Sequence, residues 1–512
     1  MLPIMDMART ANESLWEASS PGTAYPPLED GVAAEVAVVG GGITGLTTAY
    51  LLARAGVSVV LLEARAIALG TTGHTTAKVT ALHGVTYSEL IDRHGEGKAT
   101  VYAEANQAAV ERIAAIAAEH GIECDLRRLT AYAYAQLPEH LADIEAEVAA
   151  ANRAGLPVRL ETNLPLPFPT AGAVALDEQV LFHPRRYCLG LAEALVAAGG
   201  TIHEQSRVES IEQQNDGFIV GTSAGSVNAR WVVQATLLPI NDRAGLFAQT
   251  EPSRSYAVAT PVDDPEPWGM FLSVETPHRS LRPHKLQNGR SYLIIEGEEH
   301  RTGADTAADQ HFVALEDWAR ENIPGVSSFD YRWSAQDYFP ADGIPFVGQL
   351  NNSPERMLVA TGFKKWGMSN GTAAAMMLSD LIMGRPNPWL EVFDARRPAL
   401  TRGLVEVAKS NLDVARHFVG DRLARVPGVE DLGPGQGSVV DVDGTRCAVY
   451  RDEAGNLVAL SARCTHMGCL VGFNPAERSW DCPCHGSRFG LEGHVLEGPA
   501  VEPLKPVELP QD

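Results

Sequence analysis

The residues with the clearest chemical potential stand together near the C-terminal end of the chain. Four of the seven cysteines fall within residues 464–485, together with two histidines, in the order Cys464, His466, Cys469, Cys482, Cys484, His485. Thiolates and imidazoles are the usual protein ligands of zinc and of iron–sulfur centres. The first residues lead us to expect no secretory leader, and in a protein that is not secreted this clustering favours a metal centre over a disulfide framework. The ligand types alone leave both metals open. The scattered cysteines, Cys124, Cys188 and Cys447, are expected to be small buried residues.

A second motif, G-x-G-x-x-G, lies near the other end of the chain at Gly40–Gly45. It follows a strand-like run and opens a helix-like run, and Glu63 ends the next strand-like run 18 residues after Gly45. In this context the glycines permit a tight turn, close approach to a pyrophosphate and close helix packing. The helix N-terminus would face the phosphates, and Glu63 would accept hydrogen bonds from the ribose hydroxyls. The motif predicts a dinucleotide site without choosing between FAD and NAD.

The complete C-terminal pattern, C-x-H-x-x-C followed by C-x-C-H-G-S, resembles the Rieske family and its disulfide-containing branch over about residues 421–512. The resemblance implies a [2Fe-2S] cluster in which two thiolates hold one iron and two imidazoles the other, with the ligands Cys464, His466, Cys482 and His485. It also implies a disulfide between Cys469 and Cys484, and a hydrogen bond from Ser487 to a bridging sulfide. The Ser487 position and the later GHVLEGPAVEPL run argue against the zinc alternative. Phe489 stands where high-potential relatives have a tyrosine. We therefore expect a potential below the top of the Rieske range of about −150 to +300 mV.

Residues 35–400 resemble the family of FAD proteins that includes D-amino-acid oxidase, glycine oxidase and sarcosine oxidase. The resemblance rests on the glycine motif, on the Gly/Thr-rich segment 70–84, and on DGIPFVG and ATGFKKWGMSNGTAAAMM far downstream. It implies that segment 70–78 wraps the flavin and that 362–369 faces the flavin pyrimidine edge, where negative charge develops on reduction. The residues that it implies for FAD binding are Gly40, Gly42, Ile43, Thr44, Gly45, Glu63, Ala64, Arg65, Thr71, Thr72, Thr75, Thr76, Ala77, Val208, Gly362, Gly367 and Met368. No second G-x-G-x-x-G follows, so no separate NAD(P)H domain is expected.

The substrate site is less defined by the sequence, and no catalytic residue is assigned. Amino-acid-oxidising relatives often carry an Arg-Pro pair before the Asp of the D-G-x-P motif, where this chain has Asp337-Tyr338. This difference argues against a simple amino acid and leaves room for a cationic amine. Candidate basic residues at the substrate are Lys364, Lys365, Arg279 and Arg282, each of which is also compatible with a solvated surface charge. His74 and His83 flank the flavin segment, and a non-covalent flavin is favoured over attachment through His74.

The elements that must position these residues follow from the hydrophobic patterns. Residues 35–63 read as a β–α–β unit, and helices are expected over 96–120, about 137–154 and about 308–322. Short strands with glycine-rich turns begin near 421. We therefore predict an α/β FAD-binding Rossmann-type domain with an interleaved mixed α+β substrate domain, followed by a small all-β Rieske domain. The expected boundaries are an N-terminal arm (1–34), the oxidoreductase (35–400), a linker (401–420) and the Rieske domain (421–512).

Composition and charge exclude several other classes. The chain is 45% hydrophobic and has a formal net charge of −23, which disfavours nucleic acid or an anionic membrane as a partner. No run approaches the about 20 apolar residues of a membrane span, so we expect a cytoplasmic protein. The motifs together predict an FAD-dependent dehydrogenase that oxidises a C–N bond of an amine or amino acid. Its electrons would pass one at a time through the cluster to a one-electron acceptor, which the motifs do not identify. One alternative is an electron carrier whose flavin a protein donor reduces, and another is an assembly or sensing module.

Overall fold

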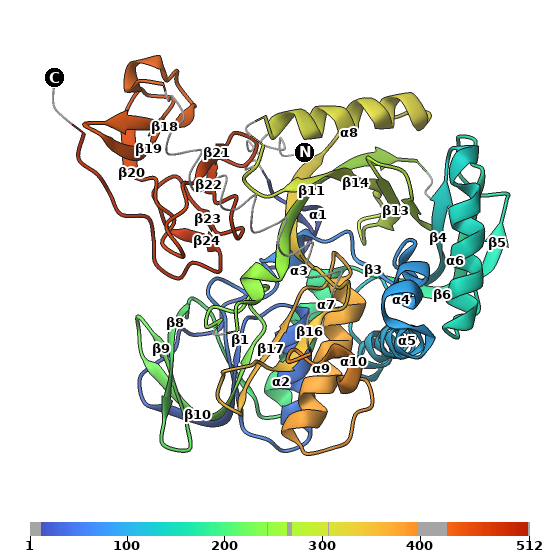
Figure 1. The fold of residues 1–512 in the computed structure, drawn as a ribbon, viewed down its shortest axis with the longest axis horizontal. Helices are drawn as coiled ribbons and strands as arrows, with labels where there is room; N and C mark the ends of the chain where they lie inside the picture. The colour runs from blue at the N-terminus through green and yellow to red at the C-terminus, as the bar shows by residue number, and fades with distance from the viewer. Residues whose placement is uncertain (1–11, 243, 264–268, 306, 398–426, 510–512) are drawn as a thin grey trace.

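The structure is a computed structural model of the 512-residue chain, and it describes residues 12–242, 244–263, 269–305, 307–397 and 427–509. Three parts stand side by side in Figure 1. A lower sheet is covered by helices, an upper sheet packs against helices α6 and α8, and small strands at the upper left form the C-terminal part. None of the described helices combines the length and apolar character that crossing a bilayer requires.

The lower sheet is built around parallel strands, as the glycine motif predicts. β1, β2, β7, β10 and β17 pair in parallel, β16 runs antiparallel at one edge, and a β8–β9 hairpin extends β10. A parallel sheet with helices on its faces is buried, so its strands are continuous apolar runs. The strands, in sheet order, are β16 (Phe346–Gln349), β17 (Met357–Thr361), β10 (Ser226–Gln234), β1 (Val32–Val39), β2 (Val59–Leu62) and β7 (Thr201–His203), with β8 (Val208–Gln214) and β9 (Gly217–Thr222).

The upper sheet is mixed and draws its strands from several separate stretches of the chain, which is the interleaving that the sequence predicts. It stands above the lower sheet in Figure 1. Its strands, in sheet order, are β15 (Tyr331–Pro340), β11 (Thr250–Val262), β14 (Ser291–Arg301), β13 (Arg279–Lys285), β12 (Met270–Ser273), β4 (Arg127–Ala135), β6 (Gly172–Leu181) and β3 (Lys78–Val79), with β5 (Arg159–Glu161) paired to β6.

The helices confirm the expected long segments. Those expected over 96–120, 137–154 and 308–322 are α5, α6 and α8, and α2 packs against α7 and α9 beside the lower sheet. The helices are α1 (Leu15–Ala18), α2 (Ile43–Arg54), α3 (Thr71–His74), α4 (Thr86–His94), α5 (Glu96–Glu119), α6 (Leu141–Arg153), α7 (Pro184–Ala197), α8 (Asp309–Asn322), α9 (Gly367–Ile382) and α10 (Leu390–Phe393), with 3-10 turns η1 (Pro138–His140), η2 (Leu246–Ala248) and η3 (Val429–Asp431).

The C-terminal part is all-β, as predicted, with its own apolar core around Trp480 and Phe489. Two small sheets form it, one of three strands and one of four. Their strands are β18 (Gly437–Val442), β19 (Thr445–Arg451), β20 (Leu457–Ser461), β21 (Gly472–Asn474), β22 (Ser479–Asp481), β23 (Arg488–Phe489) and β24 (Val495–Glu497).

The N-terminal segment is more integrated than the expected arm over residues 1–34. Trp16 is fully buried and donates from its indole nitrogen to the carbonyl of Thr75 at 2.7 Å, while Ser14 donates to the carbonyl of Gly73 at 2.6 Å. β1 also begins at Val32, before the expected boundary. The segment therefore supports the stretch expected to wrap the flavin. The linker expected over 401–420 lies outside the described residues.

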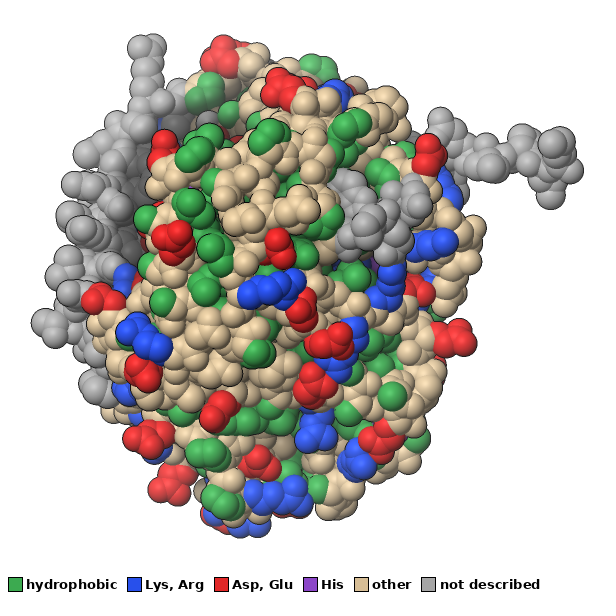
Figure 2. Space-filling model, turned by 90° about the vertical axis from the view of Figure 1, so that its right-hand side faces the viewer, with side chains coloured by type: hydrophobic (Ala, Val, Ile, Leu, Met, Phe, Trp, Pro, Cys, Tyr) green, Lys and Arg blue, Asp and Glu red, His purple; other side chains and the backbone are tan. Residues whose placement is uncertain are grey.

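Charge is mixed on the face in Figure 2, where acidic and basic side chains alternate and apolar ones are scattered. The net charge of −23 is therefore not gathered into a single acidic patch on this face.

Candidate functional site

The glycine motif forms a tight turn between β1 and α2. Gly40 has φ +107°, and a β-carbon there would lie 2.5 Å from the carbonyl oxygen of Ala235. A β-carbon on Gly45 would lie 1.9 Å from the carbonyl oxygen of Gly40. Larger residues would therefore push the helix off the strand, and the amide groups at the start of α2 would lose their place at the cavity.

Glu63 ends β2 and is fixed by the backbone of the same turn. Its two carboxylate oxygens accept hydrogen bonds from the amides of Gly41 (2.7 Å) and Arg65 (2.8 Å). Each oxygen keeps a further lone pair on the side of the cavity that Glu63 lines. This arrangement suits the two adjacent hydroxyls of a ribose.

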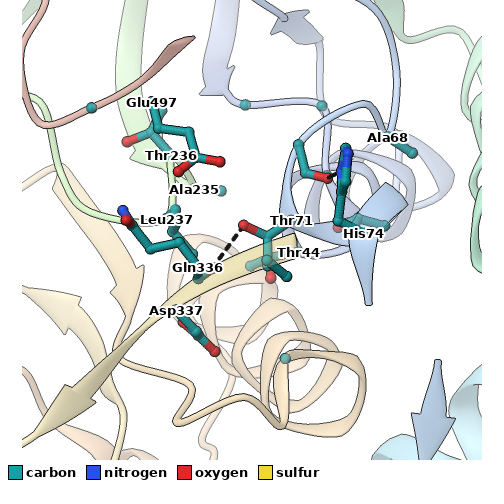
Figure 3. Close-up of a pocket in the computed structure, with 18 of the residues that line it drawn as sticks. Thr44, Ala68, Thr71, His74, Ala235, Thr236, Leu237, Gln336, Asp337 and Glu497 are labelled. Atoms are coloured by element: carbon teal, nitrogen blue, oxygen red, sulfur yellow. Dashed lines mark hydrogen bonds between the residues drawn. The ribbon is translucent and has the colours of Figure 1, made fainter. Parts of the chain in front are cut away.

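One long cavity runs from this turn to the upper sheet. Of the residues expected at FAD, those that line it are Gly40, Gly42, Ile43, Thr44, Glu63, Ala64, Arg65, Thr71, Thr72, Thr75, Thr76, Val208, Gly367 and Met368. Gly45, Ala77 and Gly362 are not among the lining residues and act through packing and backbone shape. Figure 3 shows Thr44, Thr71 and His74 on one side and Ala235, Thr236 and Leu237 on another.

The far end of the cavity is formed by an unusual loop before α9. Lys364 and Lys365 both have positive φ (+55° and +64°), a conformation that costs free energy in non-glycine residues and often marks a functional site. The loop presents the N-terminal end of α9, at Gly367 and Met368, to the cavity. A helix N-terminus is suited to stabilise negative charge on a bound ring. With the glycine turn and Glu63, these features fit FAD.

The candidate substrate residues separate into two groups. Lys365 lines the cavity, and Lys364 lines a second, polar cavity next to it. Arg282 is fully buried and donates to the carbonyls of Thr76 (2.8 Å) and Ala77 (3.2 Å). It therefore holds the flavin-wrapping stretch and does not face a substrate. Arg279 pairs with Glu298 at 2.5 Å and also lies off the cavity lining.

The two histidines near the expected flavin segment, His74 and His83, lie in different environments. His74 lines the cavity, and its Nδ1 lies 3.0 Å from the carbonyl oxygen of Gly70. His83 is buried beside Tyr102 and stacks on Trp366, and burial lowers its pKa to about 3. His83 is therefore a neutral packing residue that supports the loop before α9.

Two carboxylates line the flavin-facing end of the cavity. Asp337 on β15 accepts hydrogen bonds from the amides of Tyr338 (2.8 Å) and Lys365 (2.7 Å), and burial raises its pKa to about 6. Glu296 on β14 is also in the lining. Burial opposes its ionisation, but His278 and Lys365 outweigh burial and hold the pKa of Glu296 below the usual range.

The cysteine- and histidine-rich loops lie next to each other in the C-terminal part. A disulfide joins Cys469 and Cys484, the pair that the resemblance implied. Three sulfurs, those of Cys469, Cys482 and Cys484, lie within 4.8 Å of one another. Cys469 and Cys484 are joined in the disulfide. The cysteines of these loops that keep a free thiol are Cys464 and Cys482, and both are buried.

The remaining polar atoms of the loops fit a [2Fe-2S] cluster. The rings of His466 and His485 lie 5.0 Å apart, and the Nδ1 atoms of both are buried without a hydrogen-bond partner. A hydrogen bond with the Cys482 thiol lowers the pKa of Cys464 to about 7. Two adjacent thiols and two buried, unpartnered imidazole nitrogens form the donor set of a Rieske centre. Ser487 accepts a hydrogen bond from the amide of Ala500 at 3.0 Å, and Phe489 is fully buried in the domain core.

The side of these loops that carries His466 and His485 contacts residues outside the C-terminal part. Phe247 packs edge-on against the rings of His466 (5.4 Å) and His485 (4.8 Å). On β15, Tyr338 donates its hydroxyl to the carbonyl of His485 at 2.9 Å, and Gln336 donates to the carbonyl of Gly486 at 2.9 Å. A β-carbon on Gly486 (φ +75°) would lie 2.8 Å from Gln336 Nε2 and 2.9 Å from the Tyr338 hydroxyl, so this close seating requires glycine.

Strand β15 thus stands between the cavity and the cluster loops. Alternate residues of a strand point to opposite faces. Ala335 and Asp337 line the cavity, and Gln336 and Tyr338 bind the loop that carries His485. Gln336 also borders the cavity, so it contacts both sites. The C-terminal part also closes the cavity itself, through Leu496, Glu497, Gly498, Ala500 and Val501. Figure 3 shows Glu497 entering the lining from that side.

A buried ion network fastens the two parts together. Arg254 on β11 contacts Glu477 at 2.9 Å and Glu497 at 3.1 Å, and the Arg254 and Glu477 side chains are each 1% exposed. Arg488 pairs with Glu477, with Asp481 at 2.9 Å and with Glu497 at 3.4 Å. The interface is therefore specific and charged rather than a loose contact between two independent domains.

Sequence reasoning missed the residues that come from the ends of other strands and from the other domain. Missed residues of the lining include Arg207, Ala235, Thr236, Leu237, Ile240, Ser255, Ala257, Glu296, Ala335, Gln336, Leu496, Glu497, Gly498, Ala500 and Val501. The run that ends at Ala235 and Thr236 had the pattern of a parallel strand, whose end lies at the same sheet edge as Gly40. The Rieske residues carried no comparable signal, because nothing in their pattern predicts which surface they cover.

Comparison with known proteins also distinguishes an oxidoreductase part from a C-terminal Rieske part. Residues 35–381 match the family described as FAD dependent oxidoreductase, and residues 423–508 match the Rieske [2Fe-2S] domain. The chain is 39% identical over 505 residues to the Rieske 2Fe-2S iron-sulfur protein YhfW of Bacillus subtilis, covering 98% of this chain and 99% of that one. The C-terminal part is 37% identical over 90 residues to the cytochrome b6-f complex iron-sulfur subunit of Pisum sativum, covering 17% of this chain and 39% of that one.

Among solved structures, glycine oxidase from Geobacillus kaustophilus has the same fold at 19% identity and a TM-score of 0.61, over 72% of this chain and 100% of that one. L-proline dehydrogenase from P. horikoshii is similar at 20% identity and a TM-score of 0.60, over 72% and 98% of the two chains. The chain therefore belongs to the FAD dependent oxidoreductase family and carries a C-terminal Rieske domain. FAD and a [2Fe-2S] cluster are the cofactors that this membership implies.

Proposed function

We propose that this FAD dependent oxidoreductase oxidises a C–N bond of an amine or amino acid and passes the electrons one at a time, through its Rieske cluster, to a separate acceptor. The carbon would lose a hydride and the nitrogen a proton, and water would split the resulting imine into a carbonyl compound and an amine or ammonia. When bound, FAD accepts an electron pair and a Rieske cluster accepts single electrons.

The observation that carries this proposal is the position of β15. Residues of this strand line the flavin cavity, and two of them bind the loop of His485, so the same strand contacts both sites. The similarity in fold to a glycine oxidase and an L-proline dehydrogenase supports C–N chemistry. The fusion holds donor and acceptor at a high effective concentration, so transfer needs no encounter between molecules.

We assign the roles of the site residues accordingly. Glu63 would hold the adenosine ribose, the start of α2 the pyrophosphate, and the start of α9 the flavin ring. The cluster ligands would be Cys464, His466, Cys482 and His485.

Anaerobic mixing with a panel of amines and amino acids tests the function. A substrate should bleach the flavin absorbance, and the EPR signal of the reduced cluster should follow in the same sample. A His485→Cys variant is the control, because it should bleach in the same way while losing the Rieske signal and passing electrons poorly to a one-electron acceptor. A fully reduced flavin beside an oxidised cluster would contradict the electron route. Bleaching by a protein donor and by no small molecule would favour the electron-carrier alternative.

A further inference from the structure

The flavin-facing wall of the cavity carries negative charge. β11 lies between β14 and β15, and its residues Ser255 and Ala257 line the cavity together with Glu296 and Asp337 from the flanking strands. Ala257 is the cross-strand partner of Glu296, and Ser255 that of Ala335, two residues before Asp337. The two carboxylates therefore stand on one face of the sheet, with only the small side chains of β11 between them.

The two carboxylates differ in their basic neighbours, and neither makes a short ion pair within the described part of the chain. Asp337 is 4% exposed, and its recorded partners are the amides of Tyr338 and Lys365. Within the described part of the chain, no Lys, Arg or His nitrogen lies within 4.0 Å of Asp337. Glu296 has one such neighbour there, His278, whose Nε2 is 4.0 Å away.

The basic residue of this part of the lining is already paired. Lys365 Nζ lies 3.3 Å from Glu299 Oε2, without hydrogen-bond geometry, so the contact is an ion pair. Its positive charge lies next to Glu299, at the border with the second cavity, and also acts on Asp337 and Glu296, so this one lysine is shared by three carboxylates. Among the described residues of this wall, the carboxylates Asp337, Glu296 and Glu299 outnumber the basic residues Lys365 and His278. A substrate carboxylate would therefore meet an excess of negative charge, whereas an ammonium group would add a hydrogen-bonding cation to it.

We propose that the substrate is a cationic amine with no carboxylate on the carbon that bears the nitrogen, and that Asp337 and Glu296 are the residues that select it. This inference rests on the proposed function, because it names the substrate class of the same cavity. Asp337 would accept a hydrogen bond from the ammonium group directly, and Glu296 would add a second negative charge from β14, on the other side of β11.

Binding can be tested apart from oxidation with two ligands that have no hydrogen on the reacting carbon. tert-Butylamine and 2-aminoisobutyrate differ in one methyl group against one carboxylate, and neither can be oxidised there. Each is titrated into the oxidised holoprotein, and the change in flavin absorbance is followed. We expect saturable binding of the amine, at least about tenfold tighter than that of the amino acid.

Three variants test whether Asp337 and Glu296 select the amine. Asp337→Asn should weaken amine binding by about 10- to 100-fold, the effect of losing a charge-assisted hydrogen bond. Glu296→Gln should weaken amine binding less than Asp337→Asn does. Asp337 also accepts a hydrogen bond from the Lys365 amide, so Asp337→Asn could disturb that loop, whereas Glu296→Gln leaves it unchanged and tests the charge alone. Glu212→Gln on β8 removes an exposed carboxylate away from the cavity lining and should change nothing. The FAD-to-protein ratio of each variant shows that the cavity is intact.

Oxidation of matched pairs then separates this inference from the proposed function. The pairs are n-butylamine with norvaline and phenethylamine with phenylalanine. Bleaching by the amino acids and not by the amines would overturn the inference and leave C–N oxidation standing. Selective binding of amines with no bleaching by either set would keep the inference and count against the proposed function. Equal binding of tert-butylamine and 2-aminoisobutyrate, no saturable binding of any amine, or unchanged affinity in both Asp337→Asn and Glu296→Gln would each overturn the inference.

Discussion

Replacing Arg254 by methionine would remove the cation that the flavin-binding part contributes to the interface with the Rieske domain. Arg254 contacts Glu477 and Glu497, and the network contains two arginines against three carboxylates. Without Arg254, one arginine, Arg488, would face all three. Removing one partner of a buried ion pair costs about 3–5 kcal/mol, because the other charge stays buried and uncompensated. The docking equilibrium should therefore fall by a factor of about a hundred to several thousand.

The assays follow from what the interface holds in place. The Rieske domain has its own core, so the variant should keep its EPR signal while its thermal unfolding separates from that of the flavin-binding part. Leu496–Val501 would leave the cavity wall, so FAD should dissociate faster, and transfer from flavin to cluster should slow. Arg478→Met is the matched control, because its pair with Glu453 is exposed (51% and 67%) and should be worth about 0–1 kcal/mol.

The pH dependence of docking is a second test of the same ion network. Burial raises the pKa of Glu477 and of Asp481, but the two arginines outweigh burial and hold both below their ordinary values of 4.5 and 3.8. Groups with a lowered pKa stabilise docking above their ordinary pKa and lose that contribution as the pH falls. Arg488 pairs with both carboxylates within the C-terminal part, so Arg254 is the residue that ties their ionisation to docking. Docking should therefore weaken in acid, and this acid dependence should be smaller in Arg254→Met than in the unaltered protein. An Arg254→Met protein with unchanged unfolding, FAD release and transfer rate would refute this account of the interface.

Three further predictions concern single contacts. Glu63→Ala should weaken FAD retention by about 10- to 150-fold while sparing the cluster, because it removes charge-assisted hydrogen bonds of about 1.5–3 kcal/mol; FAD release on dilution measures this, and unchanged occupancy would mean that the ribose is held elsewhere. His466→Cys should abolish or strongly alter the Rieske EPR signal and leave FAD bound, whereas Cys447→Ala, at a buried free cysteine outside the cluster loops, should leave the signal intact. Tyr338→Phe removes the hydrogen bond to the His485 carbonyl, worth about 0.5–1.5 kcal/mol, and should slow flavin-to-cluster transfer by about two- to tenfold in stopped-flow experiments; an unchanged rate would exclude this contact from the route.

The sequence predicted the features that depend on local chemistry. The turn at Gly40 and the position of Glu63 follow from a motif whose residues are close in the chain, and the disulfide pair Cys469–Cys484 follows from the family pattern. Arg282 shows where such reasoning fails. From the sequence, a basic residue at this position could face a substrate or support a loop. Its hydrogen bond to the carbonyl of Thr76, 206 residues away in the chain, shows that it supports the loop. The seating of the Rieske domain was likewise beyond the sequence, because it depends on shape and charge matching between distant surfaces.

The geometry of β15 also bears on why the two cofactors share one chain. A carrier domain that had to move between donor and acceptor would need a weak, reversible contact with each. Here the ligand-bearing loop is held by Tyr338, by Gln336 and by a glycine that admits close contact, and the buried pair of Arg254 and Glu477 secures the domain nearby. Such an interface is costly to break, so flavin-to-cluster transfer should proceed in the docked state shown here. The exchange with the next acceptor must then occur at a part of the cluster loops that stays accessible, and Met467, 52% exposed and adjacent to His466, marks that side.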